Sequence, residues 1–139
     1  MPSITQQLIL HEGIRKTPYM DTTGKTTIGV GRNLSDNGLS DDEIRFLLQN
    51  DINEAELRCR QLYPWFEALD FVRRKVLIDL MFNMGPRKLG GFTRFLRCMA
   101  EQDYHEAAKA LRNSVWAQQV KGRADRLIPM IRTGEDYTT

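Results

Sequence analysis

Cysteine is scarce in this sequence, and long apolar runs are absent. The two cysteines, Cys59 and Cys98, argue against a small scaffold held together by disulfides, and a pair of thiols in a chain without a secretory signal is more often free and buried than bridged. No apolar stretch approaches the roughly 18 residues that a membrane-spanning helix needs. We therefore expect two free thiols and no insertion into a membrane.

An excess of charge of either sign is also missing. The 20 basic and 18 acidic residues leave a formal net charge of +2, which does not favour nucleic acid as a partner. The residues Met1–Leu10 lack the basic start and apolar run of a signal peptide. The sequence thus predicts a protein that is made in a cytosol without an export signal of its own. We also expect the protein to be a monomer.

Signals for a helix and a small hairpin fill the first 39 residues. Ser3 begins a capping box that predicts a helix over 3–12. β-forming residues on either side of a turn predict strands near 17–20 and 25–31. Residues 33–39 are predicted to form a loop.

Helical patterns fill the rest of the chain. A cap and an acidic first turn predict a connecting helix over about 41–62. The most apolar stretch follows Asp70 and predicts a buried core helix over 70–84, and Pro129 is expected to kink or shorten the last helix. Shorter helices are expected near 93–101, 104–112, 115–120 and 122–132.

Together these elements predict an α+β fold with one domain over 1–139. A small hairpin lobe would span about 13–40, and a larger helical lobe would span about 64–139 and include the N-terminal helix 3–12. The helix over 41–62 would join the lobes. A binding site is expected in the cleft between them.

Two carboxylates flank the step from helix to hairpin. Glu12 is expected at a helix C-terminus and Asp21 in the hairpin turn. Glycoside hydrolysis needs one protonated and one ionised carboxyl group on opposite sides of the scissile bond, and the hydroxyl of Thr27 could orient a water. Taken singly, each residue has an ordinary structural explanation, as a solvated helix end, a turn residue or a strand residue.

Glycines alternate with apolar residues in the second predicted strand. Gly29 and Gly31 leave one face of that strand nearly bare. Glycine at such positions indicates that backbone or a ligand approaches closely.

The residues around these carboxylates form a recognisable pattern. Residues 11–15 (HEGIR), 19–24 (YMDTTG) and 27–31 (TIGVG) resemble the catalytic segment of the lysozymes of T-even bacteriophages, glycoside hydrolase family 24. The family's catalytic Glu, Asp and Thr fall on Glu12, Asp21 and Thr27. The resemblance continues over nearly the whole chain, at residues 69–74, 82–85, 91–93, 106–108, 116, 123–124 and 132–134.

This resemblance implies cleavage of the β-1,4 bond between N-acetylmuramic acid and N-acetylglucosamine in bacterial peptidoglycan, with inversion. Glu12 would protonate the leaving oxygen, and Asp21, helped by Thr27, would activate a water. No metal or cofactor is implied. The resemblance further implies a phage endolysin that acts on the cell wall after release from the host cytoplasm, an ion pair between Arg123 and Glu12, and a substrate-binding set of Gly31, Phe82, Asn83, Phe92 and Arg123.

The sequence departs from the family in several places. Arg32 stands where the family has histidine, and Asp51 is its expected partner. Residues 32–39 replace a longer stretch that contains an extra strand and a short helix. Asn83 replaces a more usual glutamine, and Phe95 replaces a small polar residue, so the floor of the cleft is expected to differ.

Other functions remain open at this point. An inactive lysozyme-like module that binds the cell wall is one, although it would not need all three of Glu12, Asp21 and Thr27. A lytic transglycosylase is another, and the presence of Asp21 favours hydrolysis over it. A helical nucleic-acid-binding protein is a third, against which the near-neutral charge counts.

Overall fold

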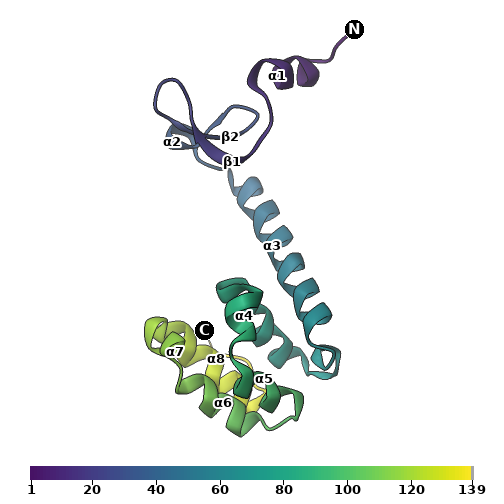
Figure 1. The fold of residues 1–139 in the computed structure, drawn as a ribbon, viewed down its shortest axis with the longest axis vertical. Helices are drawn as coiled ribbons and strands as arrows, with labels where there is room; N and C mark the ends of the chain where they lie inside the picture. Colours follow the sequence, from purple (N-terminus) through teal and green to yellow (C-terminus); the bar gives the residue numbers. More distant parts are fainter. Residues whose placement is uncertain (139) are drawn as a thin grey trace. The chain divides into compact units, whose positions relative to one another are not determined.

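The computed structural model describes residues 1–138. The chain divides into two compact units, Met1–Leu47 and Leu48–Thr139 (Figure 1). The predicted α+β class is confirmed, because helices dominate and the strands form one small sheet. Within the described residues, no helix combines the length and apolar character needed to cross a bilayer.

The first unit begins with the helix α1 (Ile4–Glu12). The predicted capping box is confirmed: the Ser3 hydroxyl accepts from the Gln6 N–H at 3.1 Å, and the Gln6 side chain accepts from the Ser3 N–H at 2.8 Å. Gly13 ends the helix at φ 76°, with its N–H donating to the Ile9 carbonyl. Glu12 is therefore the last helical residue. The prediction that this helix belongs to the helical lobe stays a prediction.

A three-stranded antiparallel sheet follows, in the order β1 (Arg15–Met20), β2 (Thr26–Gly29) and β3 (Arg32–Asn33). The predicted hairpin is confirmed as β1 and β2, which pair Tyr19 with Thr27. Thr27 in turn pairs with Asn33 of β3. The middle strand therefore places Thr27 at the centre of the sheet.

The prediction of a loop over 33–39 is wrong. Besides the end of β3, this stretch contains the short helix α2 (Leu34–Asn37). The Asn33 side chain caps it by accepting from the Asp36 N–H at 3.0 Å, and Gly38 ends it at φ 58°. The residue types that cap helices also form turns. A single helical turn with a cap at each end therefore has a composition that is also typical of a loop.

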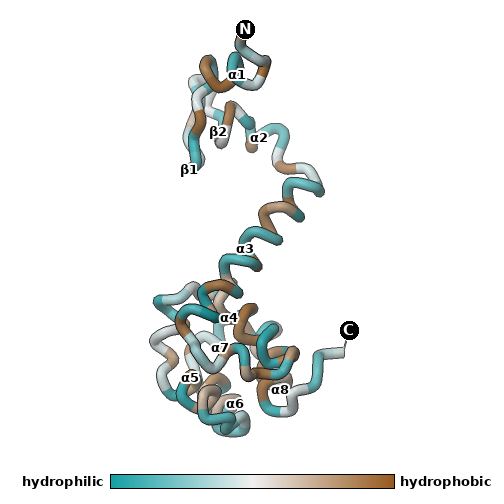
Figure 2. The backbone as a smooth tube through the Cα atoms, turned by 90° about the vertical axis from the view of Figure 1, so that its right-hand side faces the viewer, coloured by the Kyte–Doolittle hydropathy of each residue, from teal (hydrophilic) through white to brown (hydrophobic). Residues whose placement is uncertain are grey.

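The long helix α3 (Asp41–Leu62) begins and ends where the sequence predicts. Ser40 and Glu43 form its capping box, with hydrogen bonds of 2.8 and 3.2 Å. Only Ala55 and Cys59 of α3 are buried, and hydrophilic and hydrophobic residues alternate along the helix (Figure 2). Cys59 and Cys98 are both free and buried, as the sequence predicts.

The second unit holds the hydrophobic core. The predicted core helix is confirmed as the first part of α4 (Phe71–Gly90), where Val76, Leu77 and Leu80 are completely buried. Gly85 interrupts α4 at φ 81° and ψ 169°, and the helix resumes at Pro86. The remaining elements are the 3-10 helix η1 (Phe66–Ala68), α5 (Thr93–Ala100), α6 (Tyr104–Arg112), α7 (Val115–Gln119) and α8 (Lys121–Thr133).

Helix α8 does not end at Pro129, so of the two expected effects, a kink or a shortening, the shortening is wrong. It continues to Thr133, whose hydroxyl donates to the Pro129 carbonyl at 2.9 Å, and Gly134 ends it in the left-handed conformation. Arg73 of α4 bonds the Ile131 carbonyl at 2.6 Å and lies 3.6 Å from the centre of the Tyr104 ring. The Arg73 side chain thus gives a carbonyl of the last turn of α8 a hydrogen-bond donor and connects this turn to α4.

Candidate active site

Glu12 lies at the end of α1, and its carboxylate is packed against Gly31. A Cβ on Gly31 would lie 2.9 Å from Glu12 Oε2 and 3.1 Å from Cγ. Gly31 also has φ +65°, a conformation that costs other residues energy. A close approach to Gly31 is therefore present, but the approaching group is a side chain, that of the candidate acid Glu12, and not the backbone or ligand that the sequence predicted. At Gly29 nothing comes within 4 Å, and its positive φ of 69° explains the glycine.

Asp21 occupies the turn between β1 and β2, as predicted. Its Oδ1 accepts three hydrogen bonds, from the Thr23 N–H and hydroxyl at 2.8 Å each and from the Lys25 N–H at 2.9 Å. The bond from the Lys25 N–H and the bond from the Thr23 hydroxyl lower the pKa of the Asp21 carboxyl below its usual value. Asp21 is thus held ionised and in one orientation.

Thr27 is tied to the same turn through the carbonyl of Lys25. That oxygen accepts from the Asp21 N–H at 2.9 Å and from the Thr27 hydroxyl at 3.0 Å. Thr27 is only 3% exposed, which fixes its side chain. The first unit therefore holds all three members of the predicted catalytic set, and it joins Asp21 and Thr27 through one shared acceptor.

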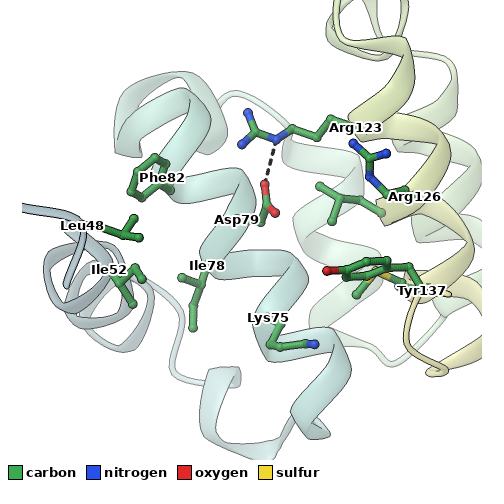
Figure 3. Close-up of a pocket in the computed structure, with 11 residues that line it drawn as sticks. Leu48, Ile52, Lys75, Ile78, Asp79, Phe82, Arg123, Arg126 and Tyr137 are labelled. Atoms are coloured by element: carbon green, nitrogen blue, oxygen red, sulfur yellow. Dashed lines mark ion pairs between the residues drawn. The ribbon is translucent and has the colours of Figure 1, made fainter. Parts of the chain in front are cut away.

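Arg123 belongs to the second unit, where its Nε lies 3.0 Å from Asp79 Oδ1 (Figure 3). The contact is an ion pair without hydrogen-bond geometry, since this buried oxygen has no hydrogen-bond partner among the described residues. Burial raises the pKa of Asp79, and the positive charges of Arg123 and Arg126 oppose that rise. The predicted pair of Arg123 with Glu12 stays a prediction.

Two pockets of the second unit contain predicted substrate-binding residues. Phe82 and Arg123 line a pocket of about 570 Å³ between α3, α4 and α8, into which Lys75, Arg126 and Tyr137 also project (Figure 3). Phe92 and Phe95 line a second pocket of about 360 Å³. Asn83 lies in neither lining and accepts a hydrogen bond from Trp116 Nε1 at 2.7 Å.

The structure also identifies charged partners that sequence reasoning missed. Arg32 pairs with Glu43 at 2.7 Å, whereas the sequence predicted Asp51. The capping motif predicts that Glu43 lies in the first turn of a helix, but it does not predict an ion pair with Arg32. Asp79, the partner of Arg123, interrupts the most apolar stretch of the chain, and a lone carboxylate in such a stretch was the available signal.

The residues described include no group of three or more histidine, cysteine, aspartate or glutamate side chains arranged to hold a metal ion. The chemistry available at Glu12, Asp21 and Thr27 is proton transfer and the orientation of water. A stiff turn that holds one ionised carboxylate, together with a second carboxylate of the same unit that is packed on glycine, suits acid–base hydrolysis.

Comparison with known proteins extends these observations to nearly the whole chain. The model of the phage lysozyme family matches residues 10–128. The pre-baseplate central spike protein Gp5 of Enterobacteria phage T4 is 29% identical over 160 aligned residues, which cover 95% of this chain and 28% of that protein. The probable T4-type lysozymes 1 and 2 of Dictyostelium discoideum are 28% and 27% identical, and each alignment covers 95% of both chains. The chain therefore belongs to the phage lysozyme family and is a glycoside hydrolase of the lysozyme type.

Proposed function

We propose that this enzyme cleaves the β-1,4 bond between N-acetylmuramic acid and N-acetylglucosamine in bacterial peptidoglycan, with inversion. The observation that carries the proposal is that one unit holds two carboxylates in fixed places. Asp21 is held ionised by three donors, and the Glu12 carboxylate is packed against Gly31. A glycosidase needs two carboxyl groups, one as an acid and one as a base.

In this mechanism Glu12 donates a proton to the leaving glycosidic oxygen. A water attacks the anomeric carbon from the opposite face of the sugar, and Asp21 accepts its proton. The three donors at Asp21 all bond Oδ1, and no residue within 1–138 donates to Oδ2. Oδ2 is therefore the oxygen assigned to the water. Inversion requires the carboxyl groups of Glu12 and Asp21 to be about 6.5–9.5 Å apart.

Thr27 is assigned to the orientation of that water. Its hydroxyl hydrogen is used in the bond to the Lys25 carbonyl, so its oxygen lone pairs are left as acceptors for a hydrogen of the water. Because the same carbonyl oxygen of Lys25 accepts from the Asp21 N–H, the position of Thr27 relative to Asp21 is fixed. A water held by both would have its lone pair directed away from the two acceptors, towards the substrate.

The remaining assignments belong to the same proposal. Gly31, Phe82, Asn83, Phe92 and Arg123 would contact the glycan, and Arg123 would pair with Glu12 when the enzyme is in its working arrangement. The protein would act as a monomer, without nucleic acid and without inserting into a membrane. It would be an endolysin, made in the cytoplasm of the host cell and acting on the wall after release to lyse the cell.

The test is hydrolysis of purified peptidoglycan, followed by loss of turbidity and by analysis of the new reducing ends. Glu12→Gln and Asp21→Asn should fold normally and lose at least about 100-fold in rate, as expected when a general acid or base is removed. Glu101→Gln is a matched control, because Glu101 is an exposed glutamate at the end of a helix, where it is the C-cap of α5. This variant should keep the wild-type rate.

The products separate the alternatives. Proton NMR of the first-formed anomer should show the α-anomer if the reaction inverts a β-bond. An anhydro product without a reducing end would indicate a lytic transglycosylase. Binding to peptidoglycan without any new reducing end would indicate an inactive wall-binding module, and either result would contradict the proposal.

A further inference from the structure

Arg32 follows Gly31 directly and makes a two-pronged ion pair with Glu43. Its Nη1 donates to Glu43 Oε1 at 2.7 Å, and its Nη2 lies 2.7 Å from Oε2. Nη1 also donates to the Gly38 carbonyl at 3.2 Å. The planar guanidinium thus engages both oxygens of one carboxylate, which fixes direction as well as distance.

Glu43 is held equally firmly from its own helix. Its Oε1 accepts from the Ser40 N–H at 2.8 Å, and its own N–H donates to the Ser40 hydroxyl at 3.2 Å. The hydrogen bond from Arg32 is the main cause that lowers the pKa of Glu43 to about 2, and the backbone N–H and the side chain of Ser40 lower it further. The carboxylate therefore stays ionised at neutral pH and belongs to the first turn of α3.

These contacts fasten the backbone at Gly31 from one side. Arg32 also begins β3 and pairs with Ile28 of β2, so the chain at this point is held by the sheet and by α3 together. The wall that Gly31 presents to Glu12 leaves no room for an added Cβ. A shift of this backbone by a few tenths of an ångström would either press on the Glu12 carboxylate or release it.

We propose that Arg32 and Glu43 are positioning residues for Glu12 and act through the backbone of Gly31. The inference rests on the proposed function, because it takes Glu12 as the general acid. A general acid is effective only when its geometry relative to the substrate is fixed. Glu12 is an exposed side chain at a helix end, and contact with the Gly31 backbone limits its rotamers. The ion pair between Arg32 of β3 and Glu43 of α3 holds that backbone in place.

The other ion pairs of the first unit do not have this arrangement. Lys25 and Asp36 meet through one contact of 3.1 Å. Arg45 and Asp42 are neighbours on the exposed surface of α3, with side chains 72% and 94% exposed. Pairs of that kind contribute little to stability, and neither touches the residue beside Gly31.

The first experiment compares Glu43→Gln with Asp42→Asn, which removes a carboxylate from the same first turn and breaks only the exposed pair with Arg45. Both variants should stay folded by circular dichroism. Glu43→Gln should lower kcat on soluble peptidoglycan fragments about five- to tenfold with little change in KM, since misplacement of an acid affects the chemical step. Asp42→Asn should stay within about twofold of wild type, as remote surface changes do.

The second measurement observes the contact itself. In the full-length protein, the carboxyl carbon signal of Glu12 and the amide signal of Gly31 should both move in Glu43→Gln and stay in place in Asp42→Asn. A merely stabilising ion pair would lower the melting temperature and leave the Glu12 carboxyl signal unchanged, whereas the amide of Gly31 lies next to Arg32 and would move in either case. If Glu43→Gln fails to fold, Arg32→Lys is read in the same way, because lysine keeps the charge and loses the fork.

The proposed function and the positioning role of Arg32 and Glu43 can be contradicted independently. If Glu12→Gln retains activity, the proposed function is wrong, and the NMR signals still decide whether Arg32 and Glu43 position Glu12. If Glu12→Gln is inactive but Glu43→Gln matches Asp42→Asn in kcat, the positioning role is overturned. An unmoved Glu12 carboxyl signal in Glu43→Gln would overturn it as well.

Discussion

The carboxylate of Glu12 lies so close to Gly31 that a Cβ there would lie 2.9 Å from Oε2. Gly31 is thus required twice, by its φ of +65° and by the side chain packed on it. Its neighbour in the same turn, Gly29, has a similar φ of +69° with open space around the missing Cβ. The two glycines separate the cost of conformation from the cost of contact.

Gly29→Ala should therefore lower stability by about 1–2 kcal/mol, the cost of a non-glycine residue in the left-handed region, and Gly31→Ala by at least as much. Only Gly31→Ala should also displace Glu12, and its loss of hydrolytic rate should exceed that of Gly29→Ala by about tenfold or more. Rates on purified peptidoglycan, measured well below each melting temperature, check this. Equal losses in the two variants would mean that the contact has no role in catalysis.

The pH dependence of activity should report the hydrogen bonds at Asp21. Because its pKa is lowered, Asp21 stays ionised below the usual carboxyl range, and the acid limb that it sets should lie correspondingly low. Thr23→Val removes the hydroxyl that donates to Oδ1 at 2.8 Å, so the pKa should rise and the acid limb should move to higher pH. The profile of kcat/KM against pH measures the shift.

Thr22→Val is the matched control for that shift, since Thr22 makes no side-chain hydrogen bond among residues 1–138 and is exposed. The same bonds also affect stability. A carboxyl with a lowered folded-state pKa stabilises the fold above its unfolded pKa, and this contribution is lost as the pH falls through the folded value. An acid limb that stays in place in Thr23→Val would show that another group sets it.

Much of the fold could be predicted because its signals are local. The caps at Ser3, Ser40 and Asp70 and the turn at Asp21 each sit in a few residues of sequence, and each is where the structure has it. Helix α2 was missed because one capped turn uses the same residues as a loop. The expected shortening of the last helix at Pro129 does not occur, because packing of the buried Leu127, Ile128, Met130 and Ile131 in the core overrides a local helix breaker.

The candidate site was predictable only in part, for a related reason. Glu12, Asp21 and Thr27 lie within 16 residues of sequence and have a fixed order, so their motif could be recognised. Their supports could not, because an ion pair such as Arg32–Glu43 or Arg123–Asp79 depends on side chains that only the folded backbone brings together. Sequence spacing says which residues share an element, and it does not say which charges meet across elements.

The core of the second unit should depend on α4. Leu77 and Leu80 are completely buried there, so Leu77→Ala or Leu80→Ala should cost about 2–5 kcal/mol of unfolding free energy, from lost burial and the cavity left behind. Leu57→Ala on α3 is the control, because Leu57 is 51% exposed and should cost less than about 1 kcal/mol. Urea unfolding measures all three, and losses below about 1 kcal/mol at both core positions would contradict the assignment.

Asp79 should lower stability at neutral pH rather than raise it. Its pKa is raised because burial disfavours the charged form more than Arg123 and Arg126 favour it. A carboxyl with a raised folded-state pKa costs folding free energy at pH values above that pKa, and the cost disappears as the pH falls through it. Asp79→Asn should therefore melt at or above the wild-type temperature at pH 7, and the difference should shrink under acid conditions.

Asp125→Asn is the control, because it removes the carboxylate of an exposed pair with Arg112 and should change the melting temperature little at any pH. If Asp79→Asn is instead clearly less stable than Asp125→Asn at pH 7, the ion pair with Arg123 outweighs the cost of burial, and Asp79 stabilises the packing of α8 on α4.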